Sequence, residues 1–186
     1  VPGQILTREI FLDPKIVDGI MVADPARDIA KVCVFERHHG SGSFGVGFVR
    51  GLELQKGAIG SSVGHDSHHL IVVGTSDEDI LDCAGRICSA GGGQAAVCGE
   101  EFRMLPLPIA GLMSPEPVAE VVRLERELDA FCEAVLGISV RRPMAVLSFM
   151  SLPVIPELRI TDRGLFSIAP GGYPQRVGIF DDIATE

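Results

Sequence analysis

The stretch HLIVVGTSDEDILDCAGRICSAGGGQAAV, residues 69–97, decides the fold class. It begins with the clearest strand pattern in the chain, the apolar run from Leu70 to Val73, which a glycine follows. A helix is predicted next, because Ser76 is a good N-cap and the three acids after it suit the positive end of a helix dipole. The triple glycine, Gly91 to Gly93, ends this helix before another apolar run.

Short β-branched and apolar runs on both sides of this stretch predict further strands. Residues 31–37 (KVCVFER) and 46–54 (VGFVRGLEL) are expected to be strands, joined by the glycine-rich turn HHGSGSFG. Residues 56–68 (KGAIGSSVGHDSH) are expected only to bring the chain around. Residues 94–108 (QAAVCGEEFRMLPLP) are typical of a hairpin. Strands joined by glycine turns favour antiparallel pairing.

The second half of the chain is more helical. Residues 115–136 carry apolar side chains at spacings of three and four, which predicts the longest helix. Residues 144–158 are compatible with a buried strand or a short helix, and residues 161–168 with a short strand before a loose tail. The expected fold class is therefore α/β or α+β, with a mixed, largely antiparallel sheet packed against helices.

Composition limits the function classes. The 186 residues carry a net charge of -9, which argues against a nucleic-acid partner or an anionic membrane surface. No apolar stretch is long enough for a membrane span. Five cysteines without a CxxC pair suggest buried thiols in a reducing compartment, so a cytoplasmic location is expected. Residues 1–30 are expected to form an extended connecting arm, and residues 31–186 the domain itself.

Two familiar motifs are not supported by the sequence. Gly40 to Gly45 (GSGSFG) matches GxGxxG literally, but a strand-like segment follows it where a dinucleotide fingerprint requires a helix. A glycine-rich hairpin turn explains the motif better. No GxSxG nucleophile elbow is present around the serines Ser61 and Ser62.

All five histidines fall in two places, each beside a predicted strand. The first is ERHH at residues 36–39 and the second is HDSHH at residues 65–69. Imidazole and carboxylate groups can ligate a metal ion or shuttle protons. In an extended chain Asp66 and His68 share one side, so a metal would need ligands from a second segment, for which Glu36 and His38 are the candidates. The alternative is an ordinary turn, in which Asp and Ser side chains bond to nearby backbone.

Several stretches together resemble the C-terminal domain of bacterial and archaeal adenine deaminase. They are GAIGSSVGHDSHHLIVVGTSDEDI, GGGQAAV, LPLPIAGLMSPEP and SLPVIPELRITDRGL, in that order. The opening residues and VFERHHGSG also resemble the segment that leads into that domain. The resemblance extends from Val1 to about Ile168.

The resemblance implies an enzyme that hydrolyses adenine to hypoxanthine and ammonia, in purine salvage. In this family, which belongs to the amidohydrolase superfamily, the metal chemistry lies in an upstream (β/α)8 barrel that uses manganese, iron or zinc. No H-x-H motif of such a barrel occurs here, so the isolated chain is expected to be inactive and without the main catalytic metal ions. The expected partners are adenine, the barrel domain and further copies in a homo-oligomer.

By the same resemblance, His65, Asp66 and His68 are the candidate catalytic residues, and Glu36 and His38 are secondary candidates for a metal. Their cluster is expected to face the barrel's active site or a subunit interface, or to bind an additional metal. His69 stands where the family usually has Asn, which puts that position's role in question. Two alternatives stay open: a free-standing domain that binds a metal or small ligand, and a structural oligomerisation module.

Overall fold

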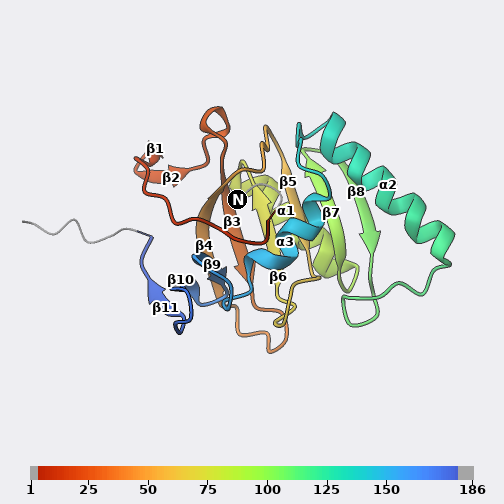
Figure 1. Cartoon of the computed structure of the whole chain (residues 1–186). Coiled ribbons are helices and arrows are strands. Elements are labelled where there is room, and N and C mark those ends of the chain that lie inside the picture. Colours follow the sequence, from red (N-terminus) through yellow and green to blue (C-terminus); the bar gives the residue numbers. More distant parts are fainter. Residues whose placement is uncertain (1–3, 180–186) are drawn as a thin grey trace, which may run out of the picture.

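The computed structural model describes residues 4–179, which form an α+β fold with one large antiparallel sheet, two smaller sheets and three α-helices (Figure 1). The outer ends of the expected arm and domain, residues 1–3 and 180–186, lie outside the described residues. No helix within residues 4–179 combines the length and hydropathy needed to cross a membrane.

The large sheet has six strands in the order β4-β3-β6-β5-β7-β8, and every neighbouring pair is antiparallel. The fold class predicted from the sequence is confirmed in its α+β form. The strands are β3 (Ile29–Phe35), β4 (Phe44–Arg50), β5 (Ala58–Ser61), β6 (Leu70–Gly74), β7 (Gly93–Cys98) and β8 (Glu101–Pro106).

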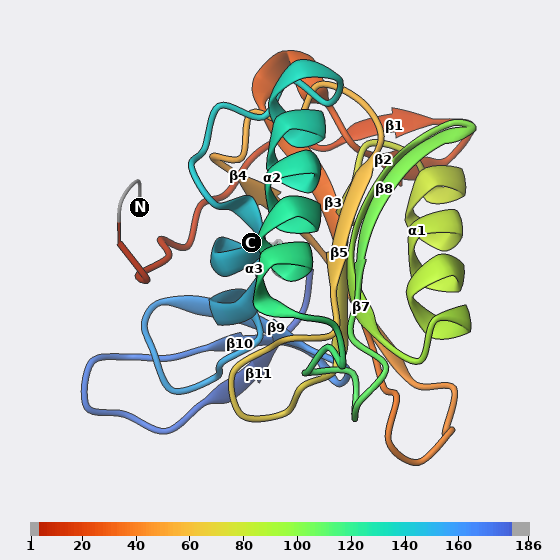
Figure 2. The ribbon, with the colours of Figure 1, turned by 90° about the vertical axis from the view of Figure 1, so that its right-hand side faces the viewer.

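Helices cover both faces of this sheet, as Figure 2 shows with the sheet seen nearly edge-on. Helix α1 (Asp77–Ser89) lies on one face, and α2 (Val118–Ala134) with α3 (Pro143–Met150) lies on the other. The predicted N-cap of α1 is confirmed, because the Ser76 hydroxyl accepts a hydrogen bond from the Asp79 amide. The segment left undecided between strand and helix, residues 144–158, contributes α3.

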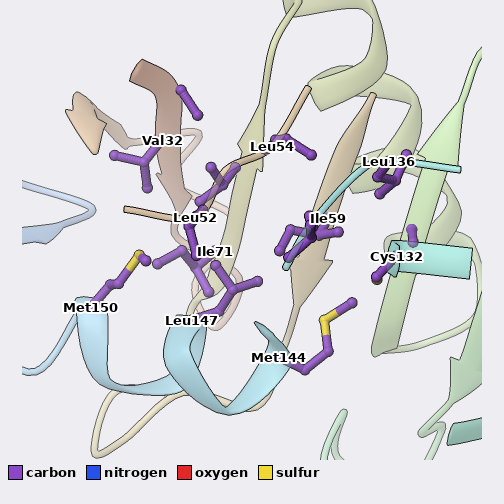
Figure 3. Close-up of a cluster of buried hydrophobic side chains, with 14 of the residues drawn as sticks. Val32, Leu52, Leu54, Ile59, Ile71, Cys132, Leu136, Met144, Leu147 and Met150 are labelled. Atoms are coloured by element: carbon purple, nitrogen blue, oxygen red, sulfur yellow. The ribbon is translucent and has the colours of Figure 1, made fainter. Parts of the chain in front are cut away.

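Alternation along β5 and β6 divides the core between the two faces. Ile59 and Ile71 point toward α2 and α3, while Ala58 and Val72 point toward α1. Figure 3 shows the larger cluster, in which side chains of α3 reach the central strands. Its most deeply buried members include Leu147, which has no exposed surface, and full burial of a leucine contributes about 1.5–3 kcal/mol.

Two of the predicted elements are corrected. Residues 58–61, expected to be part of a connection, form the central strand β5. Its AIGS sequence lacks a strand signal, because a small residue is needed where α1 packs: a Cβ at Gly60 would lie 2.9 Å from Ile87 Cδ1. The strand predicted over residues 46–54 ends at Arg50, although Leu52 and Leu54 beyond it are buried.

The chain ends of the described region form the two small sheets. Strands β9 (Leu158–Thr161), β10 (Gly164–Ser167) and β11 (Gln175–Val177) make a three-stranded sheet, so part of the tail expected to be loose is a strand. Residues 4–30, within the expected arm, contain the hairpin of β1 (Lys15–Val17) and β2 (Ile20–Val22) and a 3-10 turn, Pro25–Arg27. The division of the chain at residue 30 stays a prediction.

Candidate functional site

Four connections meet at one end of the large sheet, which we call the motif end. They are residues 36–43, 62–69, 90–92 and 107–117. The strand register places them together, since Phe35 pairs with both Phe44 and Leu70, and Ser61 pairs with both Ile71 and Gln94. In Figure 1 the connections after β3 and β5 extend side by side below the sheet. The GxGxxG match lies in the first of them, a hairpin turn as predicted.

The HDSHH segment forms a tight turn between β5 and β6. His65 and Asp66 are exposed, whereas Ser67, His68 and His69 are partly buried. The His65 amide donates to the Ser148 carbonyl at 2.8 Å, and the His65 ring lies 4.2 Å from the Phe149 ring. His65 therefore packs against α3. Asp66 and His68 both have positive φ, at 62° and 49°, a conformation that costs non-glycine residues free energy.

Arg37 joins this turn to two other parts of the motif end. Its Nε donates to the His68 carbonyl at 2.5 Å, and its Nη2 donates to the Ala110 carbonyl at 2.8 Å. The guanidinium lies against Gly111, where a Cβ would come within 2.7 Å of Nη1. Burial lowers the pKa of Arg37, but its ordinary pKa is high enough that it stays charged. The sequence-based candidates missed Arg37, although it lies inside the ERHH segment.

Ser62 joins the triple glycine to the connection that contains Gly111, residues 107–117. Its hydroxyl donates to the Gly111 carbonyl at 2.6 Å and accepts from the Gly93 amide at 2.8 Å, and the side chain is fully buried. Gly92 has φ +126°, and a Cβ there would lie 2.2 Å from the Gly111 Cα, so the two backbones touch. Ser62 is therefore part of the framework of the motif end.

His69 connects the motif end to the hairpin of β9 and β10. Its Nε2 lies 3.5 Å from Asp162 Oδ1, and its ring lies 5.1 Å from the ring of His38. Burial lowers the pKa of His69, and the negative charge of Asp162 opposes this only in part. At the position where the resemblance leads one to expect Asn, this chain thus has a partly buried imidazole beside a carboxylate. A cleft of about 690 Å³ opens next to this pair, between β4 and the three-stranded sheet, and Asp162 is in its lining.

Glu36 organises its own turn. One carboxylate oxygen accepts from the amides of His38 and His39 at 2.5 and 2.8 Å, and the other accepts from the Ser41 amide and hydroxyl. Although burial of the carboxylate opposes ionisation, the bonds from His39, Ser41 and His38 outweigh it, so the pKa of Glu36 is lowered. The side chain is only 6% exposed. Glu36 therefore stabilises the turn between β3 and β4.

The structure brings some of the five candidates together and keeps others apart. His38 Nε2 donates to the Ser67 carbonyl at 2.6 Å, so the two histidine-bearing turns are in direct contact. Within residues 4–179, however, no group of three His, Cys, Asp or Glu side chains is arranged to hold a metal ion. The carboxylate of Glu36 and the Nε2 of His38 are hydrogen-bonded within the two turns. The assignment of a metal to Glu36 and His38 stays a prediction, as do catalytic roles for His65, Asp66 and His68.

Comparison with known proteins gives one consistent result. The chain matches the family model described as adenine deaminase C-terminal domain over residues 4–170. It is 48% identical over 169 residues to an adenine deaminase of Oleidesulfovibrio alaskensis, a match that covers 90% of this chain and 30% of that protein. Adenine deaminases of Desulfatibacillum aliphaticivorans and Methanothrix thermoacetophila are each 45% identical, over 90% and 92% of this chain and 30% of their own lengths. The chain thus spans under a third of these relatives.

Proposed function

The chain belongs to the family of adenine deaminase C-terminal domains, and from this premise we propose that it is the C-terminal domain of an enzyme that hydrolyses adenine to hypoxanthine and ammonia. Because more than two thirds of each relative lies outside the match, the catalytic barrel belongs to the part that this chain does not span. In this account the isolated chain does not turn over adenine.

The motif end is the surface that faces the active site of the complete enzyme. The observation that carries this proposal is that the resembling segments, which are scattered along the chain, are bonded to one another at a single end of the sheet. Several of their polar groups are used in these internal bonds. His65 and Asp66 differ, because their side chains are exposed, while the backbone amide of His65 is bonded to the Ser148 carbonyl.

The chemistry of these two side chains suits a purine substrate. A carboxylate such as Asp66 accepts hydrogen bonds from an exocyclic amino group, and imidazole offers one donor and one acceptor when neutral. Histidine is the side chain that most often serves as a general acid or base, so His65 is the candidate for proton transfer. The His68 carbonyl is held by Arg37, and the catalytic role proposed for His68 belongs to its imidazole.

The catalytic metal ions of the complete enzyme, manganese, iron or zinc, belong to the barrel in this proposal. Such ions would activate the water that attacks the purine ring. A cytoplasmic location and assembly into a homo-oligomer are also part of the proposal, and the five free cysteines support the location.

A direct test compares this chain alone with a fusion. In the fusion, this chain replaces the matched part of the Oleidesulfovibrio alaskensis adenine deaminase. Adenine turnover, followed as ammonia release with manganese or iron supplied, is expected from the fusion and not from the chain alone. Turnover by the isolated chain would place the catalytic residues within it and contradict the proposal. A folded fusion without turnover would also contradict it.

A further inference from the structure

The N-terminal part of the chain exposes an unusual amount of apolar surface. Eight of the 17 large apolar side chains that the described residues expose lie within residues 5–20. Their exposed fractions run from 41% to 70%, with Phe11 the highest. They are Ile5, Leu6, Ile10, Phe11, Leu12, Ile16, Val17 and Ile20. Scattered apolar residues are normal on a surface, but such a concentration marks an interaction site.

This segment is tied to the domain at several points. The side chain of Thr7 donates to the Leu158 carbonyl and accepts from its amide, and the Glu9 amide donates to the carboxylate of Glu157. The buried guanidinium of Arg159 donates to the Ile5 carbonyl at 2.5 Å. Further along, Arg27 donates to the carbonyl of Asp13. Residues 5–9 are therefore attached to the domain, while the apolar side chains of residues 10–20 stay exposed.

The hairpin at the end of this segment is incomplete as a sheet. Strands β1 and β2 pair only with each other among the described residues, and Ile16, Val17 and Ile20 are 60%, 47% and 60% exposed. An isolated two-stranded hairpin is marginally stable in water at best, and a third strand or a covering surface is needed. Figure 1 shows this hairpin standing apart from the large sheet, away from the connections of the motif end.

We propose that residues 5–20, here called the apolar arm, are the docking surface for the part of the adenine deaminase polypeptide that this chain does not span. The inference rests on the proposed function. It assigns to that partner a contact separate from the motif end. Apolar side chains of the partner cover Phe11 and its neighbours, and the partner either adds a strand to the β1–β2 hairpin or covers it. The chain thereby holds the rest of the enzyme at two places, so the motif end is positioned by the arm.

The covalent partner is favoured over a second copy of the chain. More than two thirds of each matched relative lies outside this chain, which provides ample surface to cover eight side chains. A tethered partner also acts at a high effective concentration, on the order of millimolar, which a second copy in dilute solution does not reach.

The test measures amide hydrogen exchange by mass spectrometry in the chain alone and in the fusion described above. Exchange in residues 5–20 is expected to slow by about tenfold or more in the fusion, because the partner must dissociate before these amides open. The variant Phe11→Ser/Ile16→Thr/Ile20→Thr should lose this protection. The matched control Leu81→Ser/Val118→Thr/Tyr173→Ser alters side chains that are 63%, 78% and 90% exposed elsewhere, and should keep it.

Adenine turnover by the same samples separates the two proposals. Protection of the arm without turnover supports the docking surface and contradicts the proposed function. Turnover with an arm that exchanges as in the isolated chain overturns the docking surface and leaves the function standing. Loss of protection in the control variant also overturns the docking surface. Arm protection that depends on chain concentration, in sedimentation and exchange experiments, overturns it in favour of a second copy.

Discussion

The Nε of Arg37 donates to the carbonyl of His68 across 2.5 Å, so one histidine-bearing turn holds the backbone of the other. The same guanidinium donates to the Ala110 carbonyl. One side chain therefore joins three segments that are far apart in the sequence. These bonds lie in the same turn as the exposed side chains of His65 and Asp66.

Replacing Arg37 should loosen the motif end. Arg37→Ala leaves two carbonyls without their charged donor, and hydrogen bonds to charged groups contribute about 1.5–3 kcal/mol. We expect the free energy of unfolding, measured in urea, to fall by roughly 2 kcal/mol. Arg50→Ala alters an exposed arginine on β4 and should change it by less than about 0.5 kcal/mol. Equal effects of the two variants would show that Arg37 does not fasten the loops.

The contact between Gly92 and Gly111 predicts a strong difference between two glycine substitutions. Gly92→Ala places a Cβ 2.2 Å from the Gly111 Cα at φ +126°, and it should destabilise the chain by more than about 2 kcal/mol. Gly85→Ala, inside α1 with open space around it, should stabilise by about 0.5–1 kcal/mol. Thermal unfolding of both variants checks this. A Gly92→Ala protein as stable as the wild type would rule out the close approach.

Glu36 should make the stability of the chain sensitive to acid. Its pKa is lowered in the folded state, against the opposition of burial, by bonds from His39, Ser41 and His38. Its contribution is therefore complete above the unfolded pKa of about 4.3 and is lost as pH falls below that value. Glu36→Gln should be less stable than the wild type at pH 7, and the difference should shrink between about pH 4.5 and pH 2.5. Glu133→Gln, an exposed change on α2, should show no such trend. A pH-independent difference for Glu36→Gln would contradict the account.

The buried cysteines should resist alkylation and lower the stability at high pH. Burial raises the pKa of Cys33 to about 11 and that of Cys132 to about 12, and it raises the pKa of Cys83 further. At pH 8 iodoacetamide should modify the exposed Cys88 in the folded chain and reach these three only on unfolding. Peptide mapping by mass spectrometry measures this.

The raised pKa values of these thiols predict how the free energy of unfolding changes with pH in alkali. Above the ordinary thiol pKa of about 8.5 the unfolded chain releases protons that the folded chain retains, so the free energy of unfolding should fall as pH rises toward 11. Cys88→Ser should leave this slope unchanged, since its side chain is exposed. Rapid labelling of Cys83 in the folded chain would contradict the prediction.

Local patterns predicted most of the fold. Helix α1 was marked by its cap and its first-turn acids, and α2 by its periodicity, because those signals act within a few residues. Strand β5 was missed because its residues were selected by packing against α1 and neighbouring strands rather than by local propensity. The end of β4 at Arg50 was missed for a similar reason: Leu52 and Leu54 are apolar for burial outside a strand.

The site was only partly predictable. Placing the two histidine clusters at strand ends was enough to expect them near each other, and they do meet through His38 and Ser67. Arg37 and Asp162 could not be found this way, because their roles depend on contacts with residues 31 and 93 positions away, His68 and His69. The exposure of apolar side chains in the apolar arm could not be predicted either, since an apolar run in a sequence does not show whether another surface covers it.

The most direct test of the account is the kcat/KM for adenine of the fusion carrying His65→Ala/Asp66→Ala. Both side chains are exposed, so the fold should be kept, and the loss of a proton-transferring or binding group should lower kcat/KM by about 100-fold. His39→Ala is the control, because it alters a histidine at the same end whose side chain is 84% exposed, and it should have little effect. A double variant as active as this control would contradict the claim that the motif end faces the substrate.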